Sequence, residues 1–177
     1  MDYIPKLIEA YEQCGAKVVW GLNPLNFFYI HNVAAANLVG FSGGIMPIEV
    51  VFFEKLCSKI KPSNILILGN AFGWSTLILS LINPQSKVVS IDPNSQGNEL
   101  TNQIATKLGL NNCCAVDGFS PQDVESIYTR FFSDDKEKPF LFFIDALHSN
   151  YHQSLDFNAC YKIVAPEKPH YFLKAED

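Results

Sequence analysis

The feature that most constrains the fold is an apolar run that ends in a short glycine-containing turn and leads into an apolar helix. Gly69 and Gly73 bound this turn, after the run Ile65–Leu68 and directly before the helix. Gly69 permits a sharp turn, Gly73 lets a ligand pass close to the backbone, and the helix N-terminus points its amide dipoles at that ligand. A second apolar run ends in Asp92, 23 residues after Gly69. The pattern predicts an α/β sheet that binds an adenosine cofactor beyond its strand ends. Asp92 would accept hydrogen bonds from two ribose hydroxyls of that cofactor.

The spacing of the glycines distinguishes between adenosine cofactors. Dinucleotide sites use G-x-G-x-x-G, whose middle glycine makes room for a pyrophosphate, whereas this chain has Ala71 there and the spacing G-x-x-x-G. Residues 65–76 resemble the first motif of the class I S-adenosylmethionine-dependent methyltransferases, in particular small-molecule O-methyltransferases, which reads roughly [VI]-L-E-[IL]-G-x-x-x-G-[YW]-S-[TA]. Eight of the nine specified positions match, and Ile67 replaces the glutamate that usually helps to bind the cofactor.

The resemblance covers about residues 41–177 and implies an α/β, doubly wound, mostly parallel sheet of the Rossmann-like methyltransferase fold. Compared with the family, the chain lacks the usual last strands. Its first 40 residues match no family, and their apolar patterning predicts N-terminal helices ahead of the sheet. The implied cofactor is S-adenosylmethionine, with Asp92 at the ribose and with Asp117 and Phe119 at the adenine. The residues implied around its methionine portion are Gly69, Asn70, Phe72, Gly73 and Ser75.

A second segment suggests where chemistry takes place. Residues 143–151 resemble the I-D-G-x-H-x-Y segment of methyltransferases that act on sugars and other small hydroxylated molecules: Asp145, His148 and Tyr151 match, and Ala146 replaces the glycine. A carboxylate at this strand end can hold a divalent metal or orient a base, and a histidine can take a proton from a hydroxyl near neutral pH. The alternative is that His148 caps the helix that follows.

Metal sites have two candidate sets of ligands. Glu176 and Asp177 match the positions where metal-dependent members of the family place carboxylates, so that with Asp145 they imply a divalent cation such as Mg²⁺. His148, His152 and Asp156 recur every four residues and would share a helix face, which makes a zinc site conceivable. The alternative for the second set is a solvated face on which His152 and Asp156 pair.

Composition and patterning argue against several kinds of partner and location. The chain has 177 residues and a net charge of −5, without a block of Lys or Arg, which disfavours a nucleic-acid partner. No apolar run reaches the roughly 18 residues of a membrane span, and the N-terminus lacks the pattern of a signal peptide. The five cysteines match no zinc spacing and predict free thiols in a reducing cytosol. We therefore expect a cytoplasmic protein with a small-molecule substrate and no membrane partner.

Apolar patterning predicts one globular domain with an N-terminal helical or lid segment at residues 1–46 and an α/β domain at residues 47–177. We expect a helix over residues 2–14, short helices and loops over 16–46, and a helix from Pro47 to about residue 60. Strands are expected near 65–69, 87–92, 112–117, 139–145 and 170–175, and helices near 74–83, 97–109, 121–132 and 150–163. The strands are continuous apolar runs, which favours a parallel sheet buried on both faces.

Three functions remain compatible with these patterns: methyl transfer to a small-molecule oxygen, a catalytically degenerate relative kept for binding or assembly, and NAD-dependent oxidoreduction. The last expected strand has a further consequence. A strand near residues 170–175 at the edge of the sheet leaves backbone donors and acceptors unpaired beside Phe172 and Leu173. We therefore expect either a homo-oligomer that forms through this C-terminal edge or a longer natural chain. The aromatic segment at residues 20–31 is the other available cover for the edge.

Overall fold

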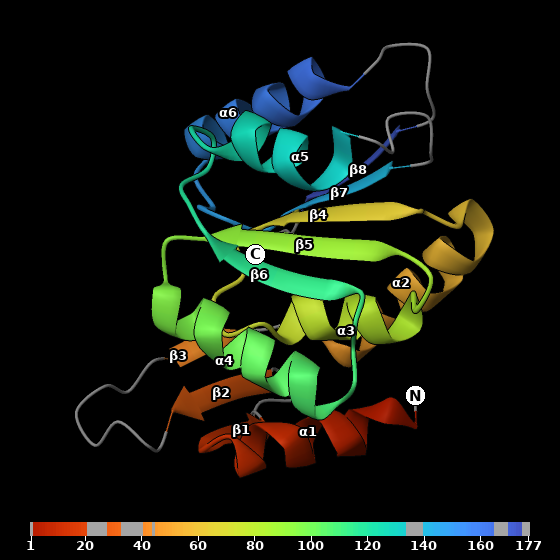
Figure 1. Ribbon diagram of the computed structural model, residues 1–177, viewed down its shortest axis with the longest axis vertical. Coiled ribbons are helices and arrows are strands. Elements are labelled where there is room, and N and C mark those ends of the chain that lie inside the picture. The colour runs from red at the N-terminus through yellow and green to blue at the C-terminus, as the bar shows by residue number, and fades with distance from the viewer. Residues whose placement is uncertain are drawn as a thin grey trace.

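A parallel five-stranded sheet with the strand order β6-β5-β4-β7-β8 organises the molecule (Figure 1). The computed structural model describes residues 2–20, 28–32, 41–43, 45–133, 140–164 and 170–174. The strands are β4 (Asn64–Leu68), β5 (Lys87–Asp92), β6 (Cys113–Asp117), β7 (Phe140–Ile144) and β8 (His170–Lys174). The chain moves outward from β4 first to one side and then to the other, so the strand order reverses between β4 and β7. Ligands of open α/β sheets bind beside such a switch point.

Helices cover both faces of this sheet. Figure 1 shows α2 (Pro47–Ile60), α3 (Trp74–Ile82) and α4 (Ser95–Lys107) on one side and α5 (Val124–Phe132) and α6 (Asn150–Ile163) on the other. This confirms the predicted doubly wound α/β architecture. Strand bounds agree with the prediction to within one residue, whereas α5 begins three residues later than predicted because residues 121–123 form a turn.

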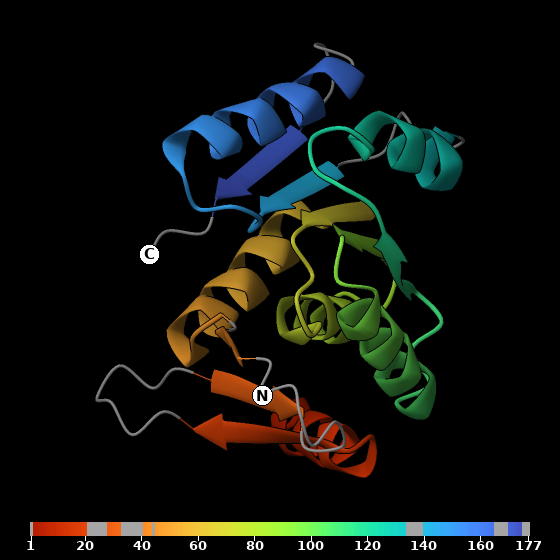
Figure 2. The ribbon, with the colours of Figure 1, turned by 90° about the vertical axis from the view of Figure 1, so that its left-hand side faces the viewer.

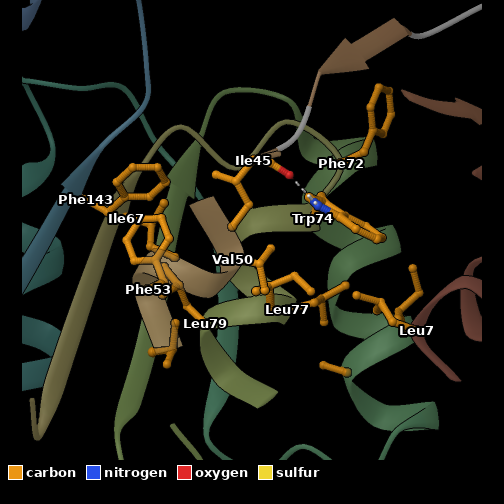
Figure 3. Packing of buried hydrophobic residues seen from close by; sticks show 14 of the residues in the cluster. Leu7, Ile45, Val50, Phe53, Ile67, Phe72, Trp74, Leu77, Leu79 and Phe143 are labelled. Carbon is orange, nitrogen blue, oxygen red and sulfur yellow. Dashed lines mark hydrogen bonds between the residues drawn. The ribbon is translucent and has the colours of Figure 1, made fainter. Parts of the chain in front are cut away.

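The core explains why the strands read as unbroken apolar runs. Ile65 and Ile67 of β4 belong to the hydrophobic cluster on one face, and Leu66 and Leu68 belong to the cluster on the other. All four side chains are fully buried. In Figure 3, Ile67 lies beside Phe53 of α2 and close to Phe143 of β7. The position where the resembling family carries a cofactor-binding glutamate is therefore a core position here.

The N-terminal segment differs from its prediction. After α1 (Tyr3–Gln13), the strands β1 (Ala16–Trp20), β2 (Phe28–Asn32) and β3 (Phe41–Gly43) form an antiparallel sheet with the order β1-β2-β3. The expected short helices and loops are therefore wrong for these residues, because runs such as 18–20 and 28–30 consist of β-branched and aromatic residues that favour strands. The division at residue 46 stays a prediction.

The segment α1 reaches the glycine turn directly. The buried Tyr11 hydroxyl donates a hydrogen bond of 2.8 Å to the Phe72 carbonyl, and the Tyr11 ring lies 6.1 Å from that of Trp74. In Figures 1 and 2 the N-terminal elements lie on the side of α3 and α4. The turn at residues 69–73 is thus held from outside the sheet as well. None of the helices in the described ranges is long and apolar enough to cross a membrane.

Candidate active site at the carboxyl ends of the central strands

A cavity of about 530 Å³ opens beyond the carboxyl ends of β4, β5 and β7. Its lining includes seven of the cofactor-binding and catalytic residues predicted from the sequence, which come from segments far apart in the chain. These seven are Gly69, Asn70, Ser75, Asp92, Phe119, Asp145 and His148. A second cavity of about 560 Å³ lies between α6 and β8, and none of its described lining residues is titratable. Of the titratable residues predicted for the site, Asp92, Asp145 and His148 therefore lie at the first cavity.

Both glycines of the turn adopt left-handed backbone conformations for reasons of packing. Gly69 has φ +95°, and a Cβ there would lie 2.1 Å from the carbonyl oxygen of Asp145. Gly73 has φ +86°, and a Cβ would lie 2.1 Å from Thr101 Oγ1 of α4. Gly69 therefore lets the end of β4 pass against the end of β7. Gly73 does not line the cavity, so its missing side chain makes room for α4.

Asn70 holds the turn through its side chain, which is only 5% exposed. Its Nδ2 donates to Asn98 Oδ1 at 3.0 Å and to Thr101 Oγ1 at 2.9 Å. Its Oδ1 accepts from Thr76 at 2.8 Å and from Ser90 at 2.9 Å. These four bonds use the two donors and two lone pairs of the amide. A ligand in the cavity therefore meets the backbone of Asn70, while the side chain ties α3, α4 and β5 to the turn.

Asp92 at the end of β5 is largely engaged by the main chain. Its Oδ2 accepts hydrogen bonds of 2.8 Å from the amides of Asn70 and Ala71, and its Oδ1 accepts one of 2.8 Å from Asn94. A carboxylate offers about four lone-pair sites. One acceptor site on Oδ1 is thus left for a ligand, whereas hydrogen bonds from two ribose hydroxyls were predicted.

Of the predicted cofactor-binding residues Asp117, Phe72 and Phe119, only Phe119 lines the same cavity as Asp92. Asp117 accepts from Asn98 at 2.7 Å and from Ser95 at 2.8 Å, and these hydrogen bonds lower the pKa of its carboxyl. Asp117 lines a groove along α4 and β6 rather than the cavity. Phe72 is buried and is likewise absent from the cavity wall, whereas Phe119 lies at the cavity with 61% of its surface exposed. Only Phe119 of the two predicted adenine contacts is brought to the site.

Asp145 and His148 lie together in the loop between β7 and α6. His148 Nε2 is 3.6 Å from Asp145 Oδ1, and the two side chains are 42% and 22% exposed. The Asp145 amide donates to the Leu68 carbonyl at 2.7 Å, which fixes this loop against the end of β4. The helix cap is Ser149, whose Oγ accepts from the amide of His152. His148 is therefore not the cap of α6 and faces the cavity.

The metal predictions have separate outcomes. Glu176 and Asp177 lie outside the described residues, so the carboxylate set that includes Asp145 stays a prediction. Within the described ranges, no three His, Cys, Asp or Glu side chains form a group that could hold a metal ion. The solvated face expected for His152 and Asp156 is wrong for Asp156, which is 1% exposed and accepts a hydrogen bond from Ser120.

Seven further residues complete the cavity wall without a role predicted from the sequence. A usable signal exists for most of them, because they follow directly on the predicted strand ends at Gly69, Asp92 and Asp145. The seven are Ala71, Trp74, Ile91, Pro93, Ser120, Ala146 and Leu147. Apart from Trp74, none carries a motif of its own, so only their place beside the strand ends points to them.

Comparison with known proteins finds similarity in structure alone. No protein-family model and no curated protein matches the chain. An O-methyltransferase from Bacillus cereus in complex with S-adenosylhomocysteine superposes with a TM-score of 0.61 at 19% identity, over 92% of this chain and 62% of that one. The O-methyltransferase TomG from Streptomyces achromogenes, in complex with S-adenosylmethionine, gives 0.59 at 15% identity, over 95% and 63%. The chain has the Rossmann-like α/β fold of these methyltransferases.

A third solved structure, the S-adenosylhomocysteine-bound methyltransferase PaMTH1 from Podospora anserina, gives a TM-score of 0.56 at 14% identity, over 71% of this chain and 51% of that one. The chain thus spans less than two thirds of the length of each of these methyltransferases. The structural similarity agrees with the sequence motif at the glycine turn. At identities of 14–19% it establishes the fold alone.

Proposed function

We propose that this protein binds S-adenosylmethionine in the cavity at the ends of β4, β5 and β7 and transfers its methyl group to an oxygen of a small molecule. The observation that carries the proposal is the single cavity that joins Asp92 and the glycine turn to the pair Asp145 and His148. The first set suits a nucleoside, and the second suits removal of a proton. The fold supports the proposal, because solved methyltransferases with this fold carry S-adenosylmethionine or its product.

The charges of the cavity favour this cofactor over a dinucleotide. Asp92 and Asp145 contribute carboxylates, and the described lining contains neither Lys nor Arg. S-adenosylmethionine carries a sulfonium and an ammonium, which opposite charges stabilise, whereas a pyrophosphate would face carboxylates without a cation to pair with. Ile91, Pro93 and Phe119 supply apolar surface on which an adenine can lie. A volume of about 530 Å³ is within the usual range for cofactor sites.

The proposed mechanism assigns one task to each residue of the pair. S-adenosylmethionine supplies an electrophilic methyl group when bound. His148 removes the proton of the acceptor hydroxyl, and Asp145 orients the ring and stabilises the imidazolium that forms. Because 42% of the His148 side chain is exposed, the proton can then pass to water. Holding the oxygen in line with the methyl group supplies much of the remaining rate enhancement.

Calorimetry with S-adenosylhomocysteine and with NAD tests the proposal. The wild type should bind the homocysteine compound, and Asp92→Ala should weaken that binding by about 1.5–3 kcal/mol, the contribution of a charged hydrogen-bonding group. Asp117→Ala is the matched variant, because Asp117 also ends a strand but lies outside the cavity. It should bind as the wild type does, after circular dichroism has shown that both variants fold.

Two outcomes would favour the other functions. Binding of NAD without binding of S-adenosylhomocysteine would refute the proposal in favour of an oxidoreductase. Binding of S-adenosylmethionine without methyl transfer to any of a panel of hydroxylated acceptors would indicate a degenerate relative that binds the cofactor. In that case the cavity would retain its ligand and the pair Asp145 and His148 would lose its proposed task.

A further inference from the structure

A buried carboxylate lies directly behind the cavity wall. Ser120 lines the cavity on the loop that follows β6, and its hydroxyl donates a hydrogen bond to Asp156 Oδ1 in the middle of α6. Asp156 is 1% exposed, although much of the surface of α6 faces solvent. Burial of a carboxylate disfavours folding unless hydrogen bonds compensate. The mechanism proposed above gives Asp156 no task, so this arrangement needs a separate explanation.

The hydrogen bond from Ser120 differs from the others that hold the same loop. The Phe119 amide donates to Asp123 Oδ2 at 2.8 Å, and the Asp123 amide donates back to the Phe119 carbonyl at 2.8 Å. Those bonds close the loop on itself. The bond between Ser120 and Asp156 instead crosses from the loop to α6, and α6 begins two residues after His148. It therefore connects the wall that carries Phe119 to the helix that follows the catalytic pair.

Figure 2 shows that α6 is a long element lying over β7 and β8, and Figure 1 places α5 and α6 on the same face of the sheet. The side chain of Asp156 therefore belongs to a packed element, while Ser120 belongs to a loop. The aromatic residue next to Ser120, Phe119, is 61% exposed and so has little packing of its own to fix it. An anchor one residue away from Phe119 limits where its ring can lie.

We propose that Asp156 is a positioning residue of the cofactor site, which acts through Ser120 to fix the wall that carries Phe119 against α6. Asp156 touches neither cofactor nor acceptor. The inference rests on the proposed function, because it assumes that the cavity binds S-adenosylmethionine. The required property of residue 156 is an oxygen that accepts the Ser120 proton, so an asparagine can replace the aspartate, whereas an alanine cannot.

The experiment compares Ser120→Ala, Asp156→Ala and Asp156→Asn by calorimetry with S-adenosylhomocysteine. The two alanine variants should bind about tenfold more weakly, as expected for a lost hydrogen bond to a charged group, and the asparagine variant should stay within about twofold of the wild type. With S-adenosylmethionine as substrate, KM should rise in the alanine variants while kcat stays within about twofold, because Asp145 and His148 are unchanged.

Ser86→Ala is the matched control. Ser86 is also a serine that donates to an acceptor from another segment, the Pro62 carbonyl, but it lies at the opposite end of the sheet. Its replacement should lower the melting temperature and leave the affinity for S-adenosylhomocysteine unchanged. This separates a general loss of stability from a loss of positioning.

Two results would overturn the inference: a Ser120→Ala variant that binds as tightly as the wild type, or an Asp156→Asn variant that binds as weakly as Asp156→Ala. Hydrogen exchange tests the same link without a cofactor. Amides of residues 118–123 should exchange faster in both alanine variants than in Asp156→Asn, while those of β6 stay protected. If the wild type does not bind S-adenosylhomocysteine, the proposed function fails, and unchanged exchange in the loop would refute the positioning role independently.

Discussion

The proposed base is the residue whose replacement tests the chemistry most directly. His148→Ala should lower turnover by about 10²–10⁴-fold, the usual contribution of a general base, and should leave the affinity for S-adenosylhomocysteine unchanged. The wild-type rate should also fall in acid, because a protonated imidazole cannot accept the proton of the acceptor hydroxyl. Steady-state kinetics across pH, with calorimetry on the variant, measures both effects. An unchanged rate in His148→Ala would refute the assignment. The control is Tyr151→Phe, in the first turn of α6 and outside the cavity lining, which should keep the wild-type rate.

Asp156 also predicts how stability depends on pH. Burial raises the pKa of its carboxyl, and the hydrogen bond from Ser120 and the charge of His152 offset part of that rise. The folded state therefore holds this proton more tightly than the unfolded chain. Its contribution favours folding at pH values below the unfolded pKa of about 4 and is lost as pH rises through the folded pKa.

The variant Asp156→Asn removes this titration while it keeps an acceptor for Ser120. We expect it to have a higher melting temperature than the wild type at pH 7 and an equal one near pH 3. Thermal unfolding monitored by circular dichroism at both values measures the difference. A variant that is less stable at pH 7 would show that the ionised carboxylate stabilises the fold, contrary to this prediction.

Single residues also mark the limit of prediction from sequence. The positions of Gly69, Asp92 and Asp145 at strand ends followed from the apolar runs before them, because parallel strands bring their carboxyl ends together. Asp117 satisfied the same rule and still turns towards α4, where Asn98 and Ser95 provide donors. Asn70 faces inward for a similar reason. Which way a polar side chain turns depends on partners that only the packed helices supply.

At the scale of secondary structure, α4 packs more closely on the glycine turn than its sequence suggests. A Cβ at Gly97, in the first turn of α4, would lie 1.7 Å from the Ala71 carbonyl oxygen. Gly97 therefore serves a close approach between helix and turn, and not flexibility. The helix predicted near residues 97–109 begins at this residue, but no local pattern in the sequence indicates the contact.

This contact predicts an effect of opposite sign to helix propensity. Alanine is a better helix former than glycine by about 1 kcal/mol, yet Gly97→Ala should lower the free energy of unfolding by about 1–3 kcal/mol because it overpacks the turn. Thr106→Ala, at an exposed position of the same helix, should leave stability unchanged within about 0.5 kcal/mol. Urea denaturation of both variants measures the difference, and a stabilised Gly97→Ala would show that the turn can yield.

The elements differ in how well their sequence specifies them. The central strands β4 and β7 are buried on both faces by α2, α3, α5 and α6, so all their residues except Asn64 are apolar and the prediction was accurate. Strands β1 to β3 form a separate antiparallel sheet, and the polar and small residues between them obscured their pattern. Local propensity for strands was present there, although short helices and loops were predicted over residues 16–46.

At the scale of the whole molecule, the place of the site follows from topology. The strand order reverses between β4 and β7, and the glycine turn after β4 lies where the crossovers to either side separate. The alternation of strands and helices therefore determines where the cavity lies, independently of the individual side chains that line it. The identity of the acceptor is different, because it depends on lining side chains such as Leu147, which follow no rule of topology.

The edge of the sheet leads to the last prediction, which concerns self-association. Within the described residues, β8 pairs with β7 alone, and the neighbouring surface of α6 exposes the stacked rings of Phe157 and Tyr161, at 42% and 55%. An edge strand beside apolar surface pairs readily with another chain. Two copies that meet through β8 would be related by a two-fold axis, which closes the assembly as a dimer.

Light scattering of the 177-residue chain should therefore report a dimer whose dissociation depends on concentration. Tyr161→Lys places a charge on the exposed surface beside β8 without touching the core, so it should shift the equilibrium towards the monomer. Ile48→Lys is the matched control, because Ile48 is also exposed and apolar, at 69%, but lies on α2. A loss of the dimer in Ile48→Lys alone would move the interface to α2, and a wild type that stays monomeric at millimolar concentration would exclude self-association through β8.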